Sequence, residues 1–118
     1  MHLDDYQRKA ASTAIYPGQG TFWGLLYCNT KLNGEAGEFS EKIGKLMRDN
    51  GLGPDDFYTH IPIEKVVALK LELGDILWYV ANAAKEIGYS LQEIADANIE
   101  KLSNRKEKGT LSGSGDNR

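Results

Sequence analysis

Apolar residues at helical intervals constrain the fold of this chain more than any other feature. Between residues 21 and 50 they recur at helical intervals, mostly of three, four or seven positions, at Leu25, Leu32, Ala36, Phe39, Ile43, Leu46 and Met47. That spacing is typical of one face of an α-helix, and no stretch alternates apolar and polar residues as a β-strand does. The pattern therefore predicts an all-α fold.

Proline, glycine and capping residues divide the pattern into four helices. We expect these to cover residues 4–14, 21–50, 62 to 86 or 87, and 90 to about 106. Pro62 suits a first helical turn, and Ser90 and Glu93 have the spacing of a capping box. The connection over 52–61 is short enough to make the two long helices antiparallel neighbours. We therefore expect a central helical hairpin in a four-helix bundle, with the first and fourth helices covering it.

Composition limits the class of protein. Residues 1–107 are expected to form one domain, and the Gly- and Ser-rich residues 108–118 a flexible tail. The formal net charge is −3, so the chain lacks the excess of basic residues that is typical of proteins that bind duplex nucleic acid. No apolar run is long enough to span a bilayer, and the start has no targeting pattern, so we expect a cytoplasmic protein without a membrane partner. The single cysteine, Cys28, is expected to be a reduced core residue.

The two long helices carry the same acidic pattern, Glu-x-Gly-acid-apolar. It occurs as Glu35-Ala-Gly-Glu38-Phe39 and again as Glu72-Leu-Gly-Asp75-Ile76. With about 100° of rotation per residue, Glu35 and Glu72 lie at the edge of each apolar face, and Glu38 and Asp75 about 60° further toward solvent. If the helices pack through these faces, all four carboxylates meet at one edge. The glycine between each pair would let a neighbouring helix or a phosphate approach closely.

A cluster of four carboxylates is unfavourable unless a cation neutralises it. The expected ligands are all carboxylate oxygens, without histidine or cysteine at ligand spacing, so Mg²⁺ is the first choice and Mn²⁺ a possible substitute. Two other interpretations stay open. The acids could decorate the surface of a non-catalytic helical interaction module, or hold a redox di-metal centre, although the Glu-x-x-His pairs typical of that centre are absent.

The motifs resemble those of the MazG-like nucleotide pyrophosphohydrolases, an all-α family. The resemblance covers most of the chain and rests on three segments, which are Gly34-Glu-Ala-Gly-Glu38, Glu72-Leu-Gly-Asp75 and Asn98-Ile-Glu-Lys101-Leu-Ser-Asn-Arg105. It implies hydrolysis of a nucleoside triphosphate to the monophosphate and pyrophosphate. The implied metal ligands are Glu35, Glu38, Glu72 and Asp75, and Glu38 is the candidate catalytic base.

The same resemblance implies residues that bind the nucleotide. Lys101 and Arg105 share one face of the fourth helix with Asn98 and are candidates for the phosphates. Apart from the resemblance, Lys31 and Lys42 project near the acidic edge and could serve either phosphate binding or charge balance. Tyr79 and Trp23 are candidates for the base. Family members are dimers or tetramers, and we expect Trp78 to be buried against a second copy. The preferred base and sugar stay open.

Overall fold

The computed structural model describes all 118 residues as four α-helices and no strand. The helices are α1 (Leu3–Ser12), α2 (Phe22–Asp49), α3 (Ile63–Glu86) and α4 (Leu91–Lys108), with a short 3-10 helix at Tyr58–His60 inside the connection between α2 and α3. The all-α prediction is confirmed, and the predicted helix ends lie within two residues of the observed ones. No helix is long and apolar enough to cross a membrane.

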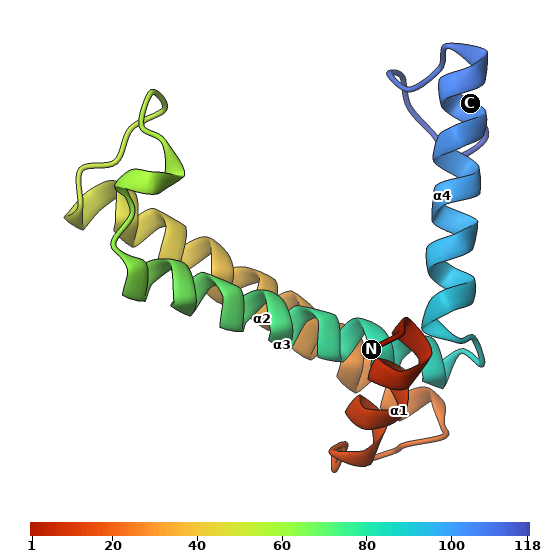
Figure 1. Cartoon of the computed structure of the whole chain (residues 1–118). Coiled ribbons are helices and arrows are strands. Elements are labelled where there is room, and N and C mark those ends of the chain that lie inside the picture. The colour runs from red at the N-terminus through yellow and green to blue at the C-terminus, as the bar shows by residue number, and fades with distance from the viewer.

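The two long helices form the predicted antiparallel hairpin (Figure 1). Thr21 and Pro62 precede their first turns in extended conformations, and Asn50 and Ile87 follow their last turns. Only a few residues of the hairpin are fully buried, among them Cys28 and Leu46. The predicted core position of Cys28 is therefore confirmed.

Helix α1 packs across α3 near the C-terminal end of α3. Trp78 donates its indole N–H to the hydroxyl of Thr13 at 2.9 Å, and its ring meets the edge of Tyr16. Trp78 is half-buried by these contacts within its own chain, and its further burial against a second copy stays a prediction.

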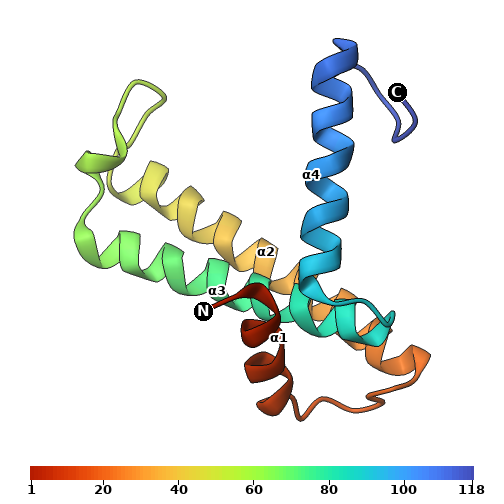
Figure 2. The ribbon, with the colours of Figure 1, turned by 45° about the vertical axis from the view of Figure 1, so that its right-hand side comes forward.

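Helix α4 leaves this junction at a steep angle and extends away from the hairpin (Figures 1 and 2). Its first turn is capped as predicted, because the Ser90 hydroxyl accepts the backbone N–H of Glu93 at 3.0 Å. It contacts α1 and α3 but not α2, so it covers less of the hairpin than we expected. Gly109, in the left-handed conformation at φ 68°, ends it two residues beyond the predicted end.

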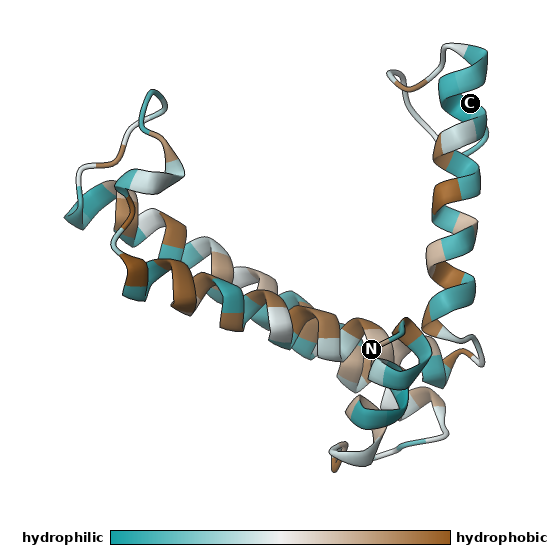
Figure 3. Cartoon of the chain, viewed as in Figure 1, coloured by the Kyte–Doolittle hydropathy of each residue, from teal (hydrophilic) through white to brown (hydrophobic).

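The resulting molecule is open. Its radius of gyration is 17.4 Å, whereas a compact domain of this length has about 13–14 Å. Only 11 of the 118 residues are buried. Figure 3 shows apolar residues along α4, and over most of its length this helix lies against no other helix. Large apolar side chains such as Leu71, Leu73 and Ile99 remain more than half exposed.

Candidate functional site

The hairpin brings three of the four predicted acids together. Carboxylate oxygens of Glu35, Glu38 and Glu72 lie within 4.8 Å of one another, two of these acids coming from α2 and one from α3. Glu72 is buried, Glu35 is half-buried and Glu38 is exposed, which is the order that the helical rotation predicts. Asp75 is exposed and outside this group of three, although it lies close enough to affect the charge of Glu35. We call Glu35, Glu38 and Glu72 the acidic cluster.

The acidic cluster fits a hard divalent cation. Its donors are all carboxylate oxygens, which Mg²⁺ and Mn²⁺ accept and which zinc sites seldom use alone. Glu72 Oε2 is buried and has no hydrogen-bond partner. A buried carboxylate oxygen without a partner is costly, and a cation would remove that cost. The residues present therefore suit the metal that the sequence predicted.

Mutual repulsion within the acidic cluster acts on Glu35. Its pKa is raised first by burial and then by the negative charges of Asp75, Glu38 and Glu72, and Lys31 opposes the shift. Burial and like charges both disfavour the ionised form. This is the expected state of a cation site whose carboxylates face one another.

A lysine from α2 provides counter-charge to the acidic cluster. Lys42 Nζ lies 3.5 Å from Glu72 Oε1 and so links α2 to α3. Lys42 also lines a groove of about 210 Å³ with Lys45 and Lys65, a lysine group that the sequence did not single out. Gly37 and Gly74 face open space, because no atom would lie within 4 Å of an added Cβ. The expected approach of a neighbouring helix at these glycines is therefore absent within one chain.

An aromatic groove lies next to the acidic cluster. Trp23 is 71% exposed, and it lines a groove of about 530 Å³ with Tyr27 and Lys31, the latter one helical turn before Glu35. Tyr79 contacts Trp78 edge-on, and its pKa is raised by burial first and then by charges that include Tyr27 and Glu35. Trp23 therefore shares a groove with Lys31, and Tyr79 lies close enough to Glu35 for its charge to act on the phenol.

Glu86, an acid outside the acidic cluster, fixes the turn that forms one side of this groove. The sequence did not reveal that role. Its carboxylate accepts the hydroxyl of Tyr16 at 2.5 Å and the backbone N–H of Gly20 at 3.0 Å. Gly24 on α2 permits this close packing, since an added Cβ would lie 2.6 Å from the carbonyl oxygen of Gly18 and 2.9 Å from Glu86 Oε1. The turn that precedes α2 is thereby tied to the end of α3.

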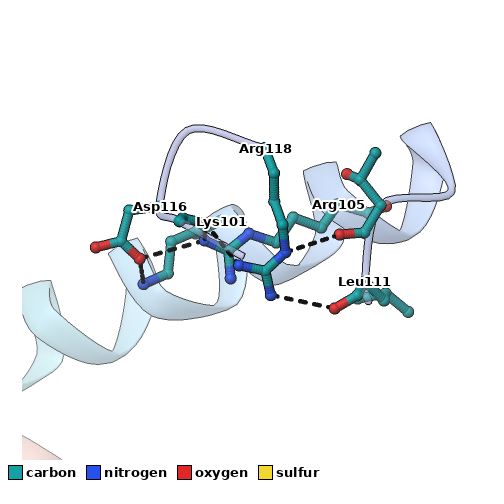
Figure 4. Close-up of polar contacts among 7 residues, drawn as sticks. Lys101, Arg105, Leu111, Asp116 and Arg118 are labelled. Carbon is teal, nitrogen blue, oxygen red and sulfur yellow. Dashed lines mark hydrogen bonds and ion pairs between the residues drawn. The ribbon is translucent and has the colours of Figure 1, made fainter. Parts of the chain in front are cut away.

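The candidate phosphate-binding residues do not join the acidic cluster within one chain. Asn98, Lys101 and Arg105 lie on α4, whose outer part extends away from the hairpin (Figures 1 and 2). Lys101 and Arg105 instead pair with Asp116 of the C-terminal tail (Figure 4). One chain therefore presents the acidic cluster and these cations at separate places.

Comparisons with known proteins identify the family of this chain. Residues 27–110, which include the acidic cluster and most of α4, match the family model of the MazG nucleotide pyrophosphohydrolase domain. Over its whole length the chain is 43% identical to the whole of Gene 37 protein from Mycobacterium phage L5, a name that states no activity. No solved structure matches the chain significantly. The family match covers well over half of the sequence and all the predicted acids, and the chain therefore belongs to the MazG nucleotide pyrophosphohydrolase family.

Proposed function

We propose that this protein is a Mg²⁺-dependent hydrolase that converts a nucleoside or deoxynucleoside triphosphate to the monophosphate and pyrophosphate. It would act on the cytoplasmic nucleotide pool, either to control it or to remove unwanted nucleotides. The observation that carries the proposal is the acidic cluster, in which three carboxylates lie within 4.8 Å and a buried oxygen of Glu72 has no partner. The family match supports the same class of reaction.

The residues of the acidic cluster have separate roles in this proposal. Glu35, Glu38 and Glu72, with Asp75 beside the cluster, would hold the cation, which would neutralise phosphate charge and increase the acidity of a nearby water. Mn²⁺ should be able to substitute for Mg²⁺ in this role. Glu38, the exposed member of the cluster, takes a proton from that water while the oxygen of the water bonds to the α-phosphorus. The bond from the α-phosphorus to the bridging oxygen breaks, and pyrophosphate leaves with the electron pair.

The aromatic groove would hold the base. Trp23 offers an exposed ring for stacking, and Tyr79 lies close enough to Tyr27 of that groove and to Glu35 for their charges to act on it. Stacking tolerates several bases because each base has a π-face. This arrangement supports binding of a nucleotide without selecting which one.

The proposed active form is a homodimer or homotetramer. Isolated chains leave Leu71, Leu73 and Ile99 exposed, and exposed apolar patches of this kind mark contact surfaces. The acidic cluster also lacks the cations of α4 within one chain. We propose that Lys101 and Arg105 reach the triphosphate at the acidic cluster of a second copy, with Asn98 beside them.

The test is product identification with the purified full chain. Each common NTP and dNTP is incubated with Mg²⁺, and the products of the wild type, Glu38→Ala and Asp75→Ala are separated by chromatography. Monophosphate and pyrophosphate from the wild type, lost in both variants, would support the proposal. If no nucleotide, modified ones included, is hydrolysed with Mg²⁺ or Mn²⁺, and neither raises the stability of the protein, the interaction module becomes the better account.

A further inference from the structure

The C-terminal tail, residues 109–118, turns back onto the last turns of α4 (Figure 4). Arg118 holds this turn closed, because its guanidinium donates to the carbonyl oxygens of Thr110 at 3.1 Å, Leu111 at 3.1 Å and Gly115 at 2.6 Å. The backbone N–H of Thr110 also donates to the carbonyl oxygen of Arg105 at 2.8 Å. The tail is therefore a defined loop that ends over the cationic residues of α4.

The loop places one carboxylate on both of those cations. Asp116 Oδ1 lies 3.4 Å from Lys101 Nζ and 3.3 Å from Arg105 Nη2. The pKa of Asp116 is lowered, first by the charge of Lys101 and its hydrogen bond, and then by the hydrogen bond and charge of Arg105. Asp116 is thus an anion at neutral pH, and it occupies the position that an anionic ligand of Lys101 and Arg105 would take.

Asp116 satisfies these cations incompletely. Both of its contacts are longer than the 2.7–2.9 Å typical of hydrogen bonds between charged groups. The side chain of Asp116 is 84% exposed, whereas that of Arg105 is only 7% exposed. Arg105 Nε is buried and has no hydrogen-bond partner. A phosphate group offers more oxygens and more charge than one carboxylate, and it can accept from two nitrogens of a guanidinium at once.

We propose that Asp116 is a built-in competitor for the phosphate-binding cations of α4. The tail closes over Lys101 and Arg105 in the free protein, and the triphosphate of the substrate displaces Asp116 from them. Displacement uncovers Arg105 Nε, which then donates to the phosphate. The inference rests on the proposed function only in taking a triphosphate as the ligand. It predicts that removing the charge of Asp116 strengthens binding of the ligand.

The test measures binding of inorganic triphosphate to the full chain by calorimetry, with a chelator present so that no turnover or metal contributes. Asp116→Asn should bind triphosphate about three- to tenfold more tightly than the wild type, since an exposed ion pair competes only weakly. Glu107→Gln is the matched control, because Glu107 is an exposed acid on α4 two residues from Arg105. The control should bind like the wild type.

A further variant and a further readout locate the effect. Adding Lys101→Ala to Asp116→Asn should abolish the gain, because the released cation is then missing. In the wild type, triphosphate should speed hydrogen exchange of the amides at residues 110–118. Equal or weaker binding by Asp116→Asn, an equal gain in Glu107→Gln, or unchanged exchange in the tail would each overturn the inference. None of these readouts uses hydrolysis, so failure of the proposed function would be seen separately.

Discussion

The hairpin of α2 and α3 presents the acidic cluster, whereas the separate helix α4 presents the cations Lys101 and Arg105. On the hairpin, two antiparallel helices bring Glu35, Glu38 and Glu72 within 4.8 Å inside one chain. On α4, Lys101 and Arg105 have no acidic partner from the hairpin and are paired with the tail instead. The acidic half of the candidate site is therefore formed within a single chain by the hairpin, whereas its cationic half lies apart from it on α4.

The first prediction concerns the acidic cluster on the hairpin, where one substitution should cause the greatest loss of activity. Glu38→Gln removes the proposed base and should lower kcat by about 10²- to 10⁴-fold, the usual contribution of general base catalysis. Folding should be unchanged, because the side chain is exposed. Steady-state kinetics with Mg²⁺ measures the effect, and Glu41→Gln, an exposed acid outside the acidic cluster on the same helix, is the control. A loss of less than tenfold would remove Glu38 from the base role.

The next effect tests the α4 half. Lys101→Ala should raise KM by about ten- to a hundredfold, because a hydrogen bond between charged groups contributes about 1.5–3 kcal/mol. Thermal stabilisation by Mg²⁺ alone should be unchanged, since the proposed cation site lies on the hairpin. Lys65→Ala, in the lysine-lined groove of the hairpin, is the comparison. If Lys65→Ala raises KM and Lys101→Ala does not, the hairpin alone holds the phosphates.

A smaller signal decides whether the two halves meet across copies. Glu38→Gln and Lys101→Ala proteins are unfolded together, refolded as a mixture and assayed at a substrate concentration well below the wild-type KM, where each variant alone has low activity. In a dimer with shared sites, half the dimers are mixed and each mixed dimer has one intact site, so about a quarter of the wild-type activity should return. Sites built within one chain would return none.

The smallest effect concerns stability and pH in the metal-free hairpin. The folded protein holds the pKa of Glu35 above its ordinary value near 4.5, first by burial and then by neighbouring charges. The folded state therefore binds the proton more tightly than the unfolded state, and stability is lost as pH rises through the raised pKa. Urea unfolding from pH 4 to 7 in a chelator should show this loss in the wild type and a smaller one in Glu35→Gln. Parallel curves for the two proteins would contradict the repulsion.

The hairpin was predictable because its signals are local. Apolar spacing, Pro62 and Gly51 set the helices, and the repeated motif sets which carboxylates face the partner helix. Even the order of burial from Glu72 to Glu38 follows from rotation about a helix axis. The exclusion of Asp75 from the closest group was not predictable, because it depends on the relative shift of two helices along each other.

The features that escaped prediction depend on contacts between distant residues. Trp78 hydrogen-bonds to Thr13, and Glu86 hydrogen-bonds to Tyr16 and Gly20, across more than 60 positions of sequence. Similarly, the direction of α4 follows from its junction with α1 and α3, and no periodicity within α4 encodes it. The pairing of Asp116 with Lys101 and Arg105 likewise required the turn that Arg118 closes.

In the proposed reaction water attacks the α-phosphorus at the acidic cluster, and isotope transfer from labelled water tests this step directly. The wild type and Glu38→Gln are incubated in ¹⁸O-labelled water with Mg²⁺ and a nucleotide that the wild type hydrolyses, and the masses of the products are measured by mass spectrometry. We expect one ¹⁸O atom in the monophosphate, none in the pyrophosphate, and almost no labelled product from Glu38→Gln. Label in the pyrophosphate, or release of labelled orthophosphate, would contradict it.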